Sequence, residues 1–317
     1  MPFTLSHAAA VLPAIRRTGA GRGPLVASAL VAGSFAPDLT YYADTVVPGA
    51  MEFGEVTHGL PGVLTVDVAV TAALAGGWLL VREPLLALLP GSWRGPAYAV
   101  ARGRPWQPRG ARQLAALTGW FYVSAMLGCA SHVVWDAFTH PGRWGTRLIP
   151  GLNEWVGGLP VAMYLQYGTS ALALAAIGWF LWTALRHARA EGPPAAVPSL
   201  SVRLRLLLTL PLALCVLAGA ADRTLRAYAV YDDTATWFDY IPSALFGAGA
   251  GLVPGLALYA VAVRLLHRRT RRRHGAEDGG RAPTTDGGDA PLPPTGPADD
   301  RVAAGTSVRA SGPPSRP

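Results

Sequence analysis

Long apolar runs dominate the pattern of hydrophobic and polar positions along this chain. Each of them is roughly as long as the ~20 residues that a helix needs to cross the core of a bilayer. The pattern therefore predicts an all-α fold, a polytopic integral membrane bundle with about five spanning helices. The runs are Leu60–Val81, Leu114–Phe138, Val161–Leu185, Leu204–Ala221 and Ser243–Leu266.

Two shorter segments precede these runs. Residues 6–17 read SHAAAVLPAIRR and predict a short helix that Ser6 caps, and residues 24–37 are apolar but too short for a standard span. A segment of that length is more typical of a buried or re-entrant helix. We therefore expect an N-terminal re-entrant or interfacial helical hairpin, and the sequence leaves open whether residues 24–37 cross the membrane.

Positive charge follows the alternation of the apolar runs. The net charge is +8, lysine is absent, and arginines gather at residues 82–112, 186–205 and 267–274. If these segments are cytoplasmic, they obey the positive-inside rule, the loops at 139–160 and 222–242 face outward, and the C-terminus is cytoplasmic. The basic excess then indicates the orientation of a multi-pass protein, and no nucleic-acid partner is expected.

One group of charges conflicts with this topology. If both short N-terminal helices dock on the outer side, Arg16, Arg17 and Arg22 lie on the wrong side for the positive-inside rule. The sequence alone does not resolve the conflict.

The last apolar run carries a stripe of small residues. Gly247, Gly251 and Gly255 recur at four-residue intervals, a spacing that lets two helix backbones approach closely. The competing interpretation is that the stripe only reflects a glycine-rich composition.

The composition changes at about Gly275. Beyond it the chain is rich in Gly, Pro, Asp, Thr and Ser and has almost no large apolar residues. Such a segment buries too little surface to offset its chain entropy. We therefore expect a single helical membrane domain over residues 1–274 and a disordered polar tail over residues 275–317.

Three residues at four-residue spacing, His132, Asp136 and His140, lie at the end of the second apolar run. A helix advances about 100° per residue, so His132 and Asp136 share one helix face on adjacent turns. His140 would lie roughly 12 Å above His132 on a straight helix, and Pro141 disfavours helical geometry there. Either the chain bends and folds His140 back, or His140 serves a second ion or a substrate.

Other histidines and acids lie beside the apolar runs on the same expected membrane face. Imidazole and carboxylate are the ligands that zinc and related divalent ions prefer. A hydrogen-bonded network satisfies the same buried groups without a metal. The candidate metal ligands are His7, Asp38, His58, His132, Asp136 and His140.

Asp67 lies inside the first apolar run, where an unpaired carboxylate is costly. It is protonated, paired with an arginine, or hydrogen-bonded to a ligand, and we place it outside the ligand set. The sequence has no nucleophile elbow, P-loop or dinucleotide fingerprint.

Four stretches in order, MPFTLSHAAAVLP, GSFAPDLTYY, THGLPG and SHVVWDAFTHPG, resemble a bacterial membrane-protein family known as domain of unknown function four-one-eight-four. The resemblance runs from Met1 to about Leu266. More distantly, the order of these motifs is similar to that of membrane-bound metal-dependent hydrolases and of the zinc-dependent phospholipase C group. That likeness implies metal ligands at His7, Asp38, His58, His132 and Asp136. PDLTYYAD lacks the further histidine that the membrane hydrolases often carry.

The sequence thus favours a metal-dependent hydrolase in the bacterial plasma membrane, with a divalent metal, expected to be zinc, at its outer face. Asp136 or Asp38 would act as the base if it is not a ligand. A site at membrane level suits a phosphoester or a lipid-like, amphiphilic substrate. The alternative is a membrane scaffold or small-solute transporter with a structural His/Asp network. The oligomeric state cannot be deduced.

Overall fold

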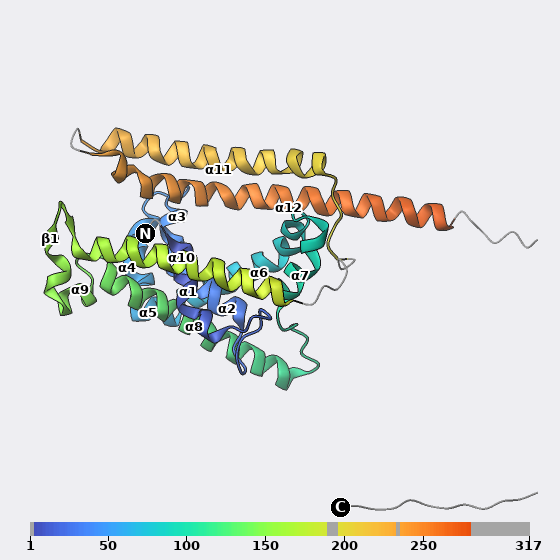
Figure 1. Cartoon of the computed structure of the whole chain (residues 1–317), viewed down its shortest axis with the longest axis horizontal. Helices are drawn as coiled ribbons and strands as arrows, with labels where there is room; N and C mark the ends of the chain where they lie inside the picture. The colour runs from blue at the N-terminus through green and yellow to red at the C-terminus, as the bar shows by residue number, and fades with distance from the viewer. Residues whose placement is uncertain (1–2, 189–195, 233–234, 280–317) are drawn as a thin grey trace, which may run out of the picture. The chain divides into compact units, whose positions relative to one another are not determined.

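The computed structural model describes residues 3–188, 196–232 and 235–279, and these are mostly helical (Figure 1). Among the described residues, five helices are long and apolar enough to cross a membrane, which confirms the predicted all-α fold. A two-stranded hairpin, β1 (Trp155–Val156) with β2 (Leu159–Pro160), precedes the third of them. The five helices are α6 (Val66–Leu86), α8 (Ala111–Thr139), α10 (Val161–His187), α11 (Val202–Val230) and α12 (Ile241–Gly279).

The chain divides into two units, Met1–Arg272 and Arg273–Pro317, and the fold described here is that of the first. The polar tail predicted for residues 275–317 falls, beyond Gly279, outside the described residues.

The first apolar run forms two helices instead of one. α5 (Leu60–Leu64) starts with Pro61 in its first turn, and the backbone leaves helical geometry at Thr65, with φ −131° and ψ −83°. The Thr65 hydroxyl donates to the Pro61 carbonyl over 2.6 Å. The long helix α6 therefore begins at Val66, later than the apolar pattern indicates.

The N-terminal segment forms a helical hairpin. Its first arm contains η1 (Thr4–His7), α1 (Ala8–Val11) and η2 (Leu12–Ala14), and its second arm is α2 (Ala27–Gly33). α2 runs beside α8, where the Val26 amide donates to Ser124 Oγ over 2.9 Å. Gly128 permits this contact, because a Cβ there would lie 2.4 Å from the Leu30 carbonyl oxygen.

The turn of the hairpin accounts for the arginines that conflict with the predicted topology. Gly19 packs against Val100, in α7 (Gly91–Arg102), and Arg104 Nη1 donates to the Gly23 carbonyl over 3.1 Å. Arg16, Arg17 and Arg22 therefore belong to the end of the bundle that carries the arginines around α7. The hairpin extends along α8, so its turn lies at the end of the bundle that carries the other arginines. The three arginines therefore no longer conflict with the positive-inside rule.

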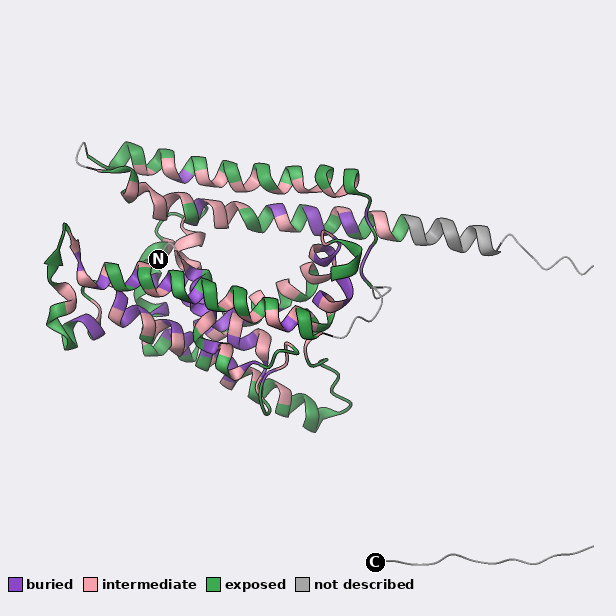
Figure 2. Cartoon of the chain, in the orientation of Figure 1, coloured by how far each residue is buried: buried purple, intermediate pink, exposed green. Residues whose placement is uncertain are grey.

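α11 and α12 lie side by side (Figure 1), and the glycine stripe of α12 forms their contact. A Cβ at Gly247 would lie 2.2 Å from the Gly219 carbonyl oxygen, and one at Gly251 would lie 2.1 Å from that of Cys215. The predicted close approach of two helix backbones is confirmed. α11 buries only Arg223, whereas buried positions are frequent on α8 (Figure 2).

The α11–α12 pair is attached to the rest of the bundle at both ends. At one end, Arg223 donates to the Tyr41 carbonyl and to Thr45 Oγ1, each over 2.8 Å. At the other end, the Tyr259 hydroxyl donates to the Pro84 carbonyl over 2.8 Å.

Candidate metal centre

α8 provides two of the candidate ligands. His132 and Asp136 lie on adjacent turns and face the same side, as their spacing predicts, and both are buried. The helix ends at Thr139, and His140 has extended geometry, with φ −123° and ψ 128°. The chain therefore bends at His140, in line with the effect of the following proline.

Asp38 and His58 come from two short segments that face α8. Asp38 ends η3 (Ala36–Asp38), the next helix after α2, and His58 follows α4 (Gly54–Thr57). Thr57 Oγ1 donates to the Pro37 carbonyl over 2.8 Å and so fixes the two segments to each other. The turn after His58 is tight, since a Cβ at Gly62 would lie 2.2 Å from the Val56 carbonyl oxygen.

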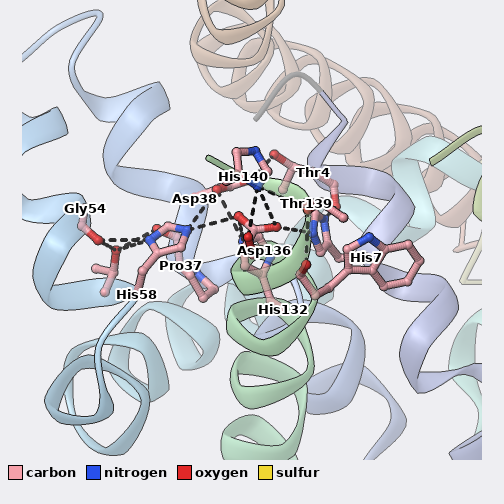
Figure 3. Close-up of polar contacts among 12 residues, drawn as sticks. Thr4, His7, Pro37, Asp38, Gly54, His58, His132, Asp136, Thr139 and His140 are labelled. Atoms are coloured by element: carbon pink, nitrogen blue, oxygen red, sulfur yellow. Dashed lines mark hydrogen bonds and ion pairs between the residues drawn. The ribbon is translucent and has the colours of Figure 1, made fainter. Parts of the chain in front are cut away.

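Four side-chain atoms from these segments converge on one point (Figure 3). They are Asp38 Oδ1, His58 Nε2, His132 Nε2 and Asp136 Oδ2, and each is buried without a hydrogen-bond partner among the described residues. Both imidazole nitrogens face both carboxylates, at 3.5 Å for each His58 contact and at 3.4 and 3.5 Å for His132. Ligand atoms of all four residues lie within 4.8 Å of one another.

The four separations between imidazole nitrogen and carboxylate oxygen are those expected of ligands that share one metal ion. Zinc binds imidazole nitrogen and carboxylate oxygen at about 2.0–2.2 Å, which gives ligand-to-ligand distances of about 3.3–3.6 Å in tetrahedral geometry. A charge-assisted hydrogen bond is shorter, at about 2.7–2.9 Å. The four contacts of 3.4 to 3.5 Å therefore fit a shared cation better than direct hydrogen bonds.

Backbone carbonyls orient both imidazoles. Nδ1 of His58 donates to the Gly54 carbonyl over 2.9 Å, and Nδ1 of His132 donates to the Ser34 carbonyl over 2.8 Å. A carbonyl oxygen only accepts, so these bonds put a proton on Nδ1, and in the neutral ring the Nε2 lone pair then faces the centre. Metal-binding histidines are typically held in this way.

The second oxygen of each carboxylate is also held. Thr4 Oγ1 donates to Asp38 Oδ2 over 2.5 Å, and the Tyr42 hydroxyl donates to Thr4 Oγ1 over 2.9 Å. His7 Nε2 lies 2.9 Å from Asp136 Oδ1. Each carboxylate therefore turns one held oxygen outward and one unpartnered oxygen toward the centre.

The electrostatics of the centre call for positive charge. Burial alone would raise the pKa of Asp38, but the facing imidazoles of His132 and His58 outweigh burial and lower that pKa below its usual range. Burial lowers the pKa of His58, yet Asp136 and Asp38 outweigh it and raise this pKa above its ordinary value. Two ionised carboxylates thus need about two positive charges, from protons or from one divalent ion.

The two other predicted ligands lie beside this group and contact Asp136. The His7 ring stacks on His132, with ring centroids 3.9 Å apart, and its Nε2 points to the outer oxygen of Asp136. His140 Nδ1 lies 3.8 Å from Asp136 Oδ1 and 3.3 Å from the Asp136 carbonyl oxygen. The Nε2 atom of His140 is buried and has no partner among the described residues.

Asp67 is fully buried at the start of α6, and neither carboxylate oxygen has a hydrogen-bond partner in the described part of the chain. It contributes no atom to the convergent group of four. Its placement outside the ligand set stays a prediction.

Thr4, Tyr42 and the carbonyls of Ser34 and Gly54 are parts of the site that sequence reasoning missed. Backbone carbonyls leave no trace in a sequence. Thr4, however, precedes the candidate ligand His7 by three residues, and both lie in the short helix η1, so that spacing was a usable signal.

The motifs in this centre fall within a single family match. A family described as domain of unknown function (DUF4184) matches residues 1–261, which is most of the chain. The chain belongs to this family. No curated protein and no solved structure matches it. Membership of DUF4184 confirms the family resemblance and assigns no activity.

Proposed function

We propose that this DUF4184 protein is a membrane-embedded, metal-dependent hydrolase that holds one divalent ion, expected to be zinc, between Asp38, His58, His132 and Asp136. The observation that carries the proposal is the convergence of four buried ligand atoms, which have no hydrogen-bond partner among the described residues and lie within 4.8 Å of one another. The residue types fit, since two imidazoles and two carboxylates form a neutral set with a divalent ion.

Protons on the two imidazoles are the main alternative to a metal. They would neutralise the same two carboxylates and leave a structural network, as in a scaffold or a transporter. The four facing distances favour the metal, because they exceed those of charge-assisted hydrogen bonds.

A divalent ion held by these four residues would act on water only through a further coordination position, where it would lower the pKa of that water toward ~7. The exposure of the surrounding side chains indicates where water and substrate reach the centre. The side chain of His140 is 21% exposed, whereas those of the four proposed ligands are at most 2% exposed. Water and substrate therefore approach from the His140 side.

His140 itself suits a role in handling that water. Burial lowers the pKa of His140 to about 4, so the ring is neutral at pH 7. Its Nδ1 faces the Asp136 carbonyl oxygen, which leaves Nε2 to accept a hydrogen bond from water. Because Asp38 and Asp136 both belong to the ligand set, this water-orienting role falls to His140 instead of either carboxylate.

The position of the centre within α8 supports a substrate that partitions into the membrane. His132 and Asp136 lie in about the last two turns of a helix that is long enough to span a bilayer. A phosphoester or lipid-like molecule at the interface would place its polar group at this depth.

We further propose that the centre faces outward across the bacterial plasma membrane and that the C-terminus is cytoplasmic. The arginines of the hairpin turn and of α7 share the opposite end of the bundle, in agreement with the positive-inside rule. A fluorescent reporter fused after Pro317 should fold and fluoresce, and an alkaline phosphatase fusion there should be inactive. The reverse result would contradict this orientation.

Metal content tests the centre directly. Elemental mass spectrometry of detergent-purified wild type should find about one zinc or similar ion per chain, and the His132→Ala/Asp136→Ala double variant should lose it. His187→Ala is the matched control, because the ring nitrogen of this exposed histidine contacts only the Thr183 carbonyl of its own helix. It should retain the metal.

Equal, negligible metal in the wild type and the double variant after attempted reloading would overturn the metal centre. The His/Asp group would then be a hydrogen-bonded network, and scaffolding or transport would become the leading function.

A further inference from the structure

The turn after α8 brings an arginine back toward the open side of the centre. Gly142 has a φ of 78°, which favours glycine, and it directs the chain into α9 (Trp144–Leu148). Thr146 Oγ1 donates to the carbonyls of Arg143 and His140, over 2.9 and 3.2 Å. The segment that carries Arg143 is therefore fixed to the segment that carries His140.

The guanidinium of Arg143 lies one aromatic ring away from a proposed metal ligand. Its Nη2 donates to the Tyr41 hydroxyl over 3.3 Å, and the centroid of the Tyr41 ring lies 5.7 Å from that of His58. Among the described residues, Tyr41 is the one side chain that accepts from this guanidinium. An arginine offers five N–H donors, so most of its capacity is free for a ligand.

No described carboxylate forms an ion pair with Arg143. Asp44, three residues after Tyr41, instead pairs with Arg223 at 3.2 Å. The acids of the neighbouring segment, Glu52 and Glu55, are exposed and make no ion pair with it. Asp38 and Asp136 are neutralised when a divalent ion is bound. The open side of the loaded centre is therefore left with the positive charge of Arg143.

We propose that Arg143 binds the anionic oxygens of a phosphate group at the open side of the metal centre, which makes a phosphomonoester or phosphodiester the substrate class. This inference rests on the proposed function. A guanidinium matches phosphate through two parallel hydrogen bonds, and a neutral ester or amide would leave the charge of Arg143 without a counterpart.

Inorganic phosphate added to cobalt-loaded protein tests the inference without any assay of activity. In detergent, phosphate should change the visible absorption of the bound cobalt in the wild type. Arg143→Gln should bind cobalt equally well but weaken phosphate binding about tenfold or more, the effect of losing a hydrogen bond to a charged group. Arg143→Lys should weaken it less, because it retains the charge without the planar fork.

Arg147→Gln is the matched control, since Arg147 is an exposed arginine in α9, the short helix that begins directly after Arg143. It should bind phosphate as the wild type does. If Arg147→Gln weakens binding as much as Arg143→Gln, the effect is one of general charge and the inference is overturned.

Nanodiscs distinguish a lipid headgroup from free phosphate. If phosphatidylglycerol nanodiscs change the cobalt spectrum of the wild type but not of Arg143→Gln, and phosphatidylcholine nanodiscs change neither, the phosphate belongs to a membrane lipid. A response to inorganic phosphate alone supports a soluble phosphoester.

Phosphate binding that is unchanged in Arg143→Gln, or a cobalt spectrum that responds to no phosphate source, would overturn the inference while leaving the metal centre in place. Failure of cobalt to bind the wild type would instead overturn the proposed function, and the inference with it.

Discussion

Two pairs of helices in this protein pack closely at glycines, but their surroundings differ. α2 approaches α8 closely at Gly128, and α11 approaches α12 closely at Gly247 and Gly251. Next to the first contact lie buried, unpartnered His and Asp atoms, whereas α11 buries only Arg223, which is hydrogen-bonded. The comparison teaches that close backbone packing indicates how helices assemble, while unpartnered buried polar atoms indicate where chemistry takes place.

Adding a single Cβ at the contact of α11 with α12 should have the largest effect on stability. In Gly251→Ala the new Cβ would lie 2.1 Å from the Cys215 carbonyl oxygen, so α11 and α12 must separate. We expect a loss of about 1–3 kcal/mol, typical of overpacking, seen as a lower thermal midpoint in detergent. Metal content should not change, because no proposed ligand lies on α11 or α12.

Gly178→Ala provides the control with the opposite sign. A Cβ at Gly178 in α10 has no neighbour within 4 Å, so alanine there should be neutral or stabilise the helix by up to about 1 kcal/mol. If Gly251→Ala also loses the metal, the two pairs are not independent and the comparison fails.

The sequence predicts well whatever depends on near neighbours along the chain. Four-residue spacing correctly places His132 and Asp136 on one face and the glycines of α12 on another, because helix periodicity is local. Pro141 correctly predicts that His140 leaves helical geometry, since the helix ends at Thr139. The five spanning helices follow from composition over about twenty residues.

The remaining features depend on contacts between distant segments. The path of the hairpin follows from Gly19 against Val100 and Gly33 against Ala125, pairs that no local pattern joins. The break at Thr65 lies within an apolar run, so the hydrophobic pattern does not mark it. Which predicted ligands converge depends on the carbonyls of Ser34 and Gly54, which any residue type would present.

Tyr42 joins the two regions that the comparison separates. Its ring packs on α12, since a Cβ at Gly249 would lie 2.2 Å from Tyr42 Cε1. Its hydroxyl donates to Thr4 Oγ1, which in turn donates to Asp38. A series of contacts therefore runs from α12 through Tyr42 and Thr4 to the proposed ligand Asp38.

Removing the Thr4 hydroxyl should have a smaller effect than Gly251→Ala, and this effect should be limited to metal affinity. Thr4→Val keeps the shape of the side chain but leaves Asp38 Oδ2 without its donor, and loss of such a partner typically weakens metal affinity about 10–100-fold. Competition with a chelating dye measures this change. Thr4→Ser should restore the affinity, because it retains the hydroxyl.

Thr169→Val is the matched control, because that hydroxyl donates only to the Leu165 carbonyl of its own helix. Tyr42→Phe should fall between Thr4→Val and the wild type, since it removes a donor to Thr4 and leaves the bond from Thr4 to Asp38 intact. If Tyr42→Phe instead weakens the metal as much as Thr4→Val, the position of α12 contributes to the centre through Tyr42. α12 would then belong to the region that holds the metal site.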